Sequence, residues 1–150
     1  MPTFHFRLQT ILNIKIQLEK STKNELGIAV QKLELQRRIL TEIQAEAGEQ
    51  EEEYRRESTN GVVLAKLKQR MEYISLLHQK DLIQQQRVNE EMKNVDKVRE
   101  KLIEIMKERK VLEKLREKEL AEYMKEQEKE AQLLVDELIS FKESNKPVDI

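Results

Sequence analysis

The chain has 150 residues, of which 38% are charged and 4% are aromatic, with three glycines, two prolines and no cysteine. Its formal net charge is −1, so charge alone does not drive the protein toward nucleic acid or an anionic membrane. The lack of cysteine excludes disulfides, a thiol nucleophile and thiolate metal ligands. This composition is typical of a coiled coil or a long helical hairpin rather than of a compact globule.

A first helix is predicted from about residue 4 to residue 57. Pro2 and Thr3 resemble a helix start, with Thr3 as the N-cap. A seam of mostly apolar or small side chains then recurs every three or four positions, at Phe4, Leu8, Ile11, Lys15, Leu18, Thr22, Leu26, Ala29, Leu33, Gln36, Leu40, Ile43 and Ala47. The turn formers Ser58-Thr59-Asn60-Gly61 predict a turn over about 58–62.

A second helix is predicted from about residue 63 to residue 142. The stretch from Leu64 to Phe141 contains neither glycine nor proline. Its apolar residues also recur every three or four positions, as in Val88, Met92, Val95, Val98 and Leu102, which predicts one narrow seam against a partner helix. Ser144-Asn145-Lys146-Pro147 ends this helix, and we expect a disordered tail over about 144–150.

The two seams pair if the chain folds back once at Asn60-Gly61. In that register Leu33 lies opposite Val88, and Leu26 lies opposite Val95. Leu18 with Leu102 and Leu8 with Leu112 continue the pairing. We therefore expect an all-α fold in which residues 1–150 form a single antiparallel coiled-coil hairpin, with the second helix longer than the first. His78 falls on the predicted seam, where a polar residue commonly sets register.

The end of the second helix has no partner in this pairing. From about Glu119 it is acidic, yet it carries an apolar cluster of Leu133, Leu134, Leu138, Ile139 and Phe141. Such a cluster on an unpaired helix needs a partner or self-association. Between Asn94 and Lys118 basic residues outnumber acidic ones, so this part either faces an acidic partner or forms a solvated helix face.

Near the turn we expect Ile74 and Leu77 to fill the core, and Tyr73 and Leu76 to form an exposed contact patch. The sequence offers little for chemistry. His5 and His78 are the two histidines, and neither lies in a catalytic or metal-binding motif. A two-helix hairpin is also expected to lack a concave pocket in which a pKa could be shifted. We expect no catalytic residue, no cofactor, no metal site, no nucleic-acid partner and no enzymatic activity.

Three segments of the chain resemble the FliJ family of flagellar type III export proteins. They are the opening Phe4-x-Phe6-x-Leu8-x-x-Ile11-Leu12, Glu53-Tyr54-Arg55 ahead of the Asn60-Gly61 turn, and Met71-Glu72-Tyr73-Ile74-x-x-Leu77. The resemblance implies a stalk-like protein of roughly 80 Å that has no catalytic role. It would sit in the hexameric flagellar export ATPase, contact the membrane export gate and escort export chaperones.

The resemblance also assigns the contact residues. The open end of the hairpin would enter the ATPase ring through Phe4, Phe6, Arg7, Leu8, Leu112 and Leu115, and the export gate would contact Tyr73 and Leu77. The implied location is cytoplasmic, peripherally associated with the membrane at the flagellar base. No run of about 20 apolar residues is present to span a bilayer, and the N-terminus lacks a secretion signal.

Two other functions fit the same residues. The protein could be a general chaperone that holds unfolded chains at its apolar ends. It could instead be a structural coiled coil that dimerises through the cluster of Leu133, Leu134, Leu138, Ile139 and Phe141.

Overall fold

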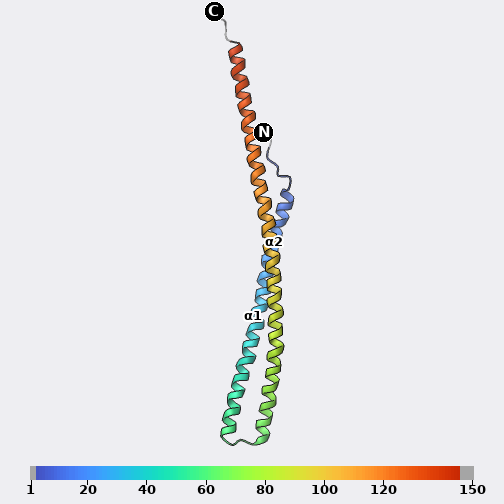
Figure 1. The fold of residues 1–150 in the computed structure, drawn as a ribbon, viewed down its shortest axis with the longest axis vertical. Coiled ribbons are helices and arrows are strands. Elements are labelled where there is room, and N and C mark those ends of the chain that lie inside the picture. Colours follow the sequence, from blue (N-terminus) through green and yellow to red (C-terminus); the bar gives the residue numbers. More distant parts are fainter. Residues whose placement is uncertain (1–2, 146–150) are drawn as a thin grey trace, which may run out of the picture. The chain divides into compact units, whose positions relative to one another are not determined.

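A computed structural model gives the fold and describes residues 3–145. Two helices account for most of this range: α1 (Gln9–Thr59, 51 residues) and α2 (Leu64–Ser144, 81 residues), with no strand in residues 3–145 (Figure 1). The all-α prediction and the longer second helix are confirmed. Residues 146–150, to which most of the predicted tail belongs, lie outside the described range.

The predicted start of the first helix at residue 4 is wrong, because α1 begins at Gln9. Residues 3–6 are not helical, so Thr3 is not an N-cap. Phe4 is half-buried and Phe6 is buried. Side chains two positions apart point to one side of an extended chain but to different sides of a helix. Because residues 3–6 are not helical, both rings can pack, which a helix would prevent.

The turn lies where the sequence predicts it. Gly61 has a φ of 73°, a left-handed conformation that favours glycine and commonly ends a helix. The amide of Asn60 donates to the carbonyl of Arg56 at 3.0 Å, and the amide of Val62 donates to the carbonyl of Glu57 at 3.2 Å. These bonds satisfy carbonyls at the end of α1 that the helix itself leaves unpaired.

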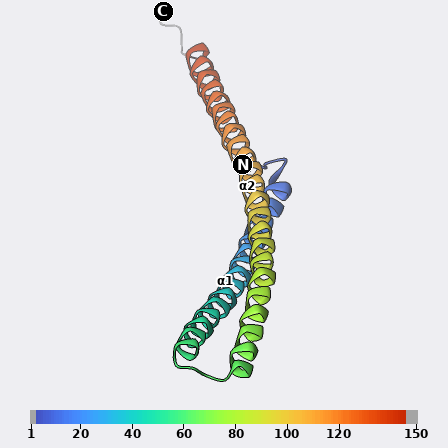
Figure 2. The same ribbon diagram turned by 60° about the horizontal axis from the view of Figure 1, so that its bottom comes forward.

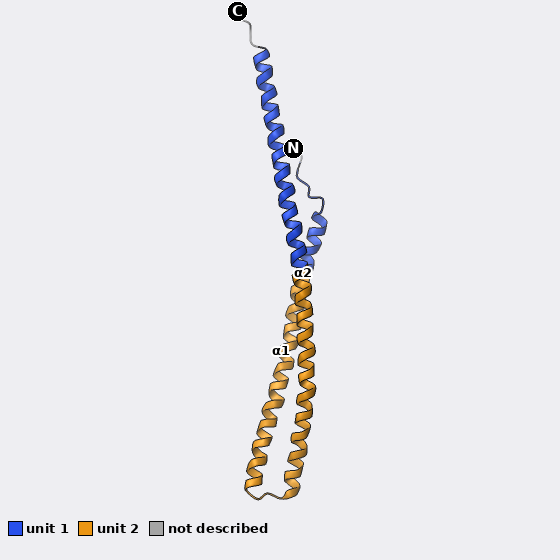
Figure 3. Cartoon of the chain, viewed as in Figure 1, with its two compact units in different colours: residues 1–18, 105–150 blue, residues 19–104 orange. Residues whose placement is uncertain are grey.

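The chain divides into two compact units, coloured in Figure 3. Unit 2 comprises residues 19–104 and contains the turn, with α1 and α2 running antiparallel on either side of it (Figures 1 and 2). Its core combines Ala29 and Leu33 of α1 with Val88 and Val95 of α2, and Leu26 packs against them. The predicted pairs of Leu33 with Val88 and of Leu26 with Val95 therefore lie in one cluster.

Several seam predictions are wrong, among them Ile11 and Met92, which are exposed. Leu18 is exposed, whereas its neighbour Glu19 is buried; His78 is exposed, whereas its neighbour Leu77 is buried. At these last two positions the buried side chain lies one residue away from the predicted one. Because neighbouring residues differ by about 100° around a helix, a shift of one position moves a side chain from the seam to its flank.

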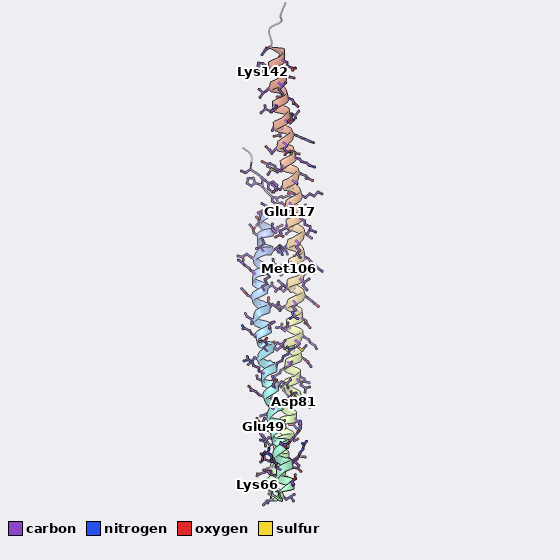
Figure 4. The ribbon with its side chains drawn as sticks, turned by 90° about the vertical axis from the view of Figure 1, so that its left-hand side faces the viewer. Glu49, Lys66, Asp81, Met106, Glu117 and Lys142 are labelled. Atoms are coloured by element: carbon purple, nitrogen blue, oxygen red, sulfur yellow. The ribbon has the colours of Figure 1, made fainter. Side chains whose placement is uncertain are left out.

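Unit 1 comprises the described residues 3–18 and 105–145. Phe6, Leu12 and Ile105 are its buried apolar residues. Farther along, α2 is no longer covered by other described residues, and every residue from 128 to 145 is exposed. Figure 4 shows side chains around Lys142 projecting from a single helix. Within residues 3–145, neither helix contains a segment both apolar and long enough to cross a membrane.

Candidate partner-binding surfaces

In unit 1 the segment before α1 is held on α2 by an aromatic contact. The ring of Phe4 lies 5.6 Å from that of Tyr123, at 49° between the planes, and the guanidinium of Arg116 lies 5.8 Å from the Phe4 centroid. The Nε of Arg116 also donates to Oε1 of Gln9 at 3.1 Å. A cation over an aromatic face is an attractive contact, so Arg116 holds both the segment and the first turn of α1.

The six residues expected to contact an ATPase differ in exposure. Arg7 is exposed and Phe6 is buried, while the other four are half-buried: Phe4, Leu8, Leu112 and Leu115. Phe6 belongs to the core of unit 1, and in this conformation its ring is not available to a partner. The accessible part of this predicted surface is Arg7 with the outer edges of the half-buried side chains.

Four lysines follow one another along α2 of unit 1 at intervals of three or four residues: Lys107, Lys110, Lys114 and Lys118. All four are exposed and none forms an ion pair with another residue in 3–145. Val111 lies among them and is 65% exposed. This spacing places the four ammonium groups on one side of the helix, where they attract an anionic surface.

The apolar cluster near the end of α2 is fully accessible. Leu133, Leu134, Leu138, Ile139 and Phe141 are between 52% and 67% exposed, and Val135, which the predicted cluster does not include, belongs with them. Positions 134, 138 and 141 form one seam, and 135 and 139 widen it. An apolar face this broad exceeds the narrow stripe of a two-stranded coiled coil and fits a surface made of more than one element.

The exposed patch predicted near the turn is confirmed in part. Tyr73 and Leu76 are exposed, at 36% and 45%, and Ile74 and Leu77 are buried as expected of core residues. The hydroxyl of Tyr73 donates to the carboxylate of Glu46, and this hydrogen bond raises the pKa of Tyr73. Since Leu77 is only 3% exposed, it supports the patch from beneath in this conformation.

Beside this patch Arg70 joins the two helices of unit 2. Its Nε and Nη2 donate to the two carboxylate oxygens of Glu57 at 2.8 and 2.6 Å, and its Nη1 donates to Gln50. The hydrogen bond from Arg70 lowers the pKa of Glu57 and raises the pKa of Arg70. The sequence does not signal this fork, because Glu57 lies four residues before Gly61 and Arg70 nine residues after it, so the predicted pairing does not place them opposite each other.

The surface near the turn is hollowed, although not into an enclosed pocket. An open groove of about 590 Å³ lies near the turn, lined by Glu51, Tyr54, Arg55, Met71, Ile74, Ser75 and His78. His78 Nε2 lies 3.0 Å from the carboxylate of Glu51 at its rim. The groove offers an apolar floor and an exposed charged rim, which suits a partner side chain. Residues 3–145 contain no group of three or more histidine, cysteine or acidic side chains that could hold a metal ion.

Comparison with protein families gives one match that covers nearly the whole chain. The family model described as "Flagellar FliJ protein" matches residues 4–147. No curated protein and no solved structure matches the chain.

Proposed function

Because the chain belongs to the FliJ family and so has a role in flagellar export, we propose that it is a non-enzymatic coupling component of the type III export apparatus. It binds the hexameric export ATPase through unit 1 and the export gate through the turn region of unit 2. It resides in the cytoplasm, peripherally associated with the membrane at the flagellar base, and escorts export chaperones.

The observation that carries the ATPase contact is the bare end of α2. Residues 128–145 are exposed throughout, yet this segment carries six large apolar side chains that are between 47% and 67% exposed: Leu133, Leu134, Val135, Leu138, Ile139 and Phe141. A soluble helix that leaves so broad an apolar face in water is expected to bury it against a partner. Arg7 and the outer edges of Phe4, Leu8, Leu112 and Leu115 extend the proposed contact within unit 1.

The gate contact rests on Tyr73 and Leu76 of unit 2. Both are exposed, and Leu77 holds the backbone of this turn of α2 against α1. Aromatic side chains with a polar tip are enriched in protein interfaces, and the hydrogen bond to Glu46 fixes the orientation of Tyr73. Tyr73 and Leu76 thus supply a preorganised surface, and Leu77 contributes by keeping it in place.

Co-purification with the cognate export ATPase tests the proposal. Truncation after Glu130 removes the apolar cluster but keeps Tyr123 and its contact with Phe4. We expect this chain to keep its helical circular dichroism and to lose ATPase binding. Leu138→Ser should weaken binding, whereas Leu82→Ser is the matched control because Leu82 is similarly exposed in unit 2. Full ATPase binding by the truncated chain would reject the assignment.

The same exposed cluster supports self-association as a second candidate. In that case sedimentation should show a dimer that forms with increasing concentration and disappears on truncation after Glu130. A general chaperone would instead bind unrelated unfolded chains, and this binding would depend on the cluster.

A further inference from the structure

A glutamine lies at the centre of the interface in unit 2. Gln84 is only 2% exposed, which places it with Thr22 among the most buried side chains in residues 3–145. Its Nε2 donates to the backbone carbonyl of Gln36 at 2.9 Å and to the side-chain Oε1 of Gln36 at 2.7 Å. Both of its amide hydrogens are therefore satisfied by a single residue of the facing helix.

The apolar residues around this pair do not by themselves define how the helices align. On α1, leucine recurs at Leu26, Leu33 and Leu40, every seven residues. On α2, Val88 and Val95 are also seven apart, and Leu102 follows after seven more. A slip of one helix by seven residues would again place leucine against valine, because the seam repeats with that period. This holds fully for one direction of slip, in which Leu33 faces Val95 and Leu40 faces Val88; the other direction would place Leu33 opposite Asp81.

Gln84 distinguishes the two registers. After a slip of seven residues its amide would meet Ala29 or Ile43 in place of Gln36, and neither side chain accepts a hydrogen bond. In the native register both amide hydrogens of Gln84 are bonded, whereas a slip leaves the hydrogen that bonds Oε1 of Gln36 without a side-chain acceptor, and a buried unpaired hydrogen is costly. We propose that the buried pair of Gln36 and Gln84 determines the register of the hairpin in unit 2.

The register matters because the surfaces near the turn are assembled from both helices. Tyr73 of α2 is held by Glu46 of α1, and the groove combines Tyr54 with Met71 and Ile74. A slip of seven residues displaces one helix by roughly 10 Å along the other, which would separate these partners. This role of the glutamine pair holds whether or not the protein binds an export ATPase.

Engineered cysteine pairs report the register directly, because the chain has no cysteine of its own. The side-chain tips of Glu25 and Lys101 lie 3.3 Å apart, so Glu25→Cys with Lys101→Cys, joined by a short bis-maleimide that makes up for the shorter side chains, reports the native register. Glu25→Cys with Asn94→Cys and Lys32→Cys with Lys101→Cys report slips of seven residues in the two directions. Each pair is treated with the same cross-linker in the full chain, alone and together with Gln84→Leu.

With Gln84→Leu we expect the ratio of slipped to native cross-links to rise about tenfold, and thermal stability to be kept or increased, since leucine buries well at this position. Gln85→Leu is the matched control, because Gln85 is the exposed neighbour that bonds within its own helix. It should show only the native cross-link. The same exclusive native cross-link in Gln84→Leu would overturn the proposal.

A double-mutant cycle gives a second, independent measurement. Gln36→Leu removes the Oε1 acceptor and leaves one amide hydrogen of Gln84 unpaired, so it should lower the melting temperature. In the background of Gln84→Leu the same change should cost little or raise the melting temperature. Equal shifts in both backgrounds would show that the two residues act separately and would also overturn the proposal.

Discussion

Truncation of Leu77 tests the division of the turn region into a core and a contact surface. Leu77 is 3% exposed, whereas its neighbour Leu76 is 45% exposed. A leucine-to-alanine change at a fully buried site costs about 2–5 kcal/mol, from lost burial and the cavity left behind. Two helices can move together to fill part of that cavity, so we expect Leu77→Ala to lower the free energy of unfolding by about 2–3 kcal/mol.

Leu76→Ala should change the free energy of unfolding by less than about 1 kcal/mol, because much of that side chain is already in water. Urea unfolding followed by circular dichroism measures both values. Binding to the export-gate domain should show the opposite order when both variants are folded, with the larger loss for Leu76→Ala. Equal destabilisation by the two changes would refute the assignment of Leu77 to the core and Leu76 to the surface.

Three further predictions concern the rest of the chain. Gly48→Ala should raise the free energy of unfolding by about 0.5–1 kcal/mol in urea titrations, because the residue lies inside α1 and an added Cβ meets nothing within 4 Å. Arg70→Gln should destabilise the hairpin at neutral pH. Because the bond from Arg70 lowers the pKa of Glu57 in the folded protein, it stabilises the fold at pH values above the pKa of Glu57 in the unfolded chain and loses this effect as the pH falls. Melting temperatures of wild type and Arg70→Gln should therefore converge as the pH falls below about 4, and a constant difference down to pH ~2 would contradict this. Phe6→Ala should cost about 3 kcal/mol and Arg7→Ala less than about 0.5 kcal/mol, and similar melting temperatures for the two would remove Phe6 from the core.

The shape of unit 1 explains why the first residues were predicted incorrectly. Phe4 fits the helical spacing of Leu8 and Leu12, so periodicity extended the helix to it. The contact that changes this conformation joins Phe4 to Tyr123 and Arg116, more than a hundred residues later. Local propensity contains no information about such a partner, and tertiary packing overrides it.

The errors at Leu18 and His78 have a different origin. Several apolar residues lie beside the seam, such as Ile11 and Leu76, and they leave the position of the seam around the helix ambiguous by one residue. Glu19 and Gln84 add to this ambiguity, because a polar residue is normally assigned to the surface when only the sequence is considered. Their burial can be explained only by the contacts that the facing helix provides.

The amino-acid sequence by itself determined the class of this protein: two long helices, one turn at Asn60-Gly61 and an uncovered end of α2 with an apolar cluster. These features follow from hydrophobic period and turn chemistry, which are local properties of the chain. The burial of Glu19 and Gln84 and the exposure of Leu18 and His78 depend on the tertiary structure, because a seam that repeats every seven residues permits several alignments. Hydrogen bonds between distant side chains, including Gln36 with Gln84 and Glu57 with Arg70, select one of them.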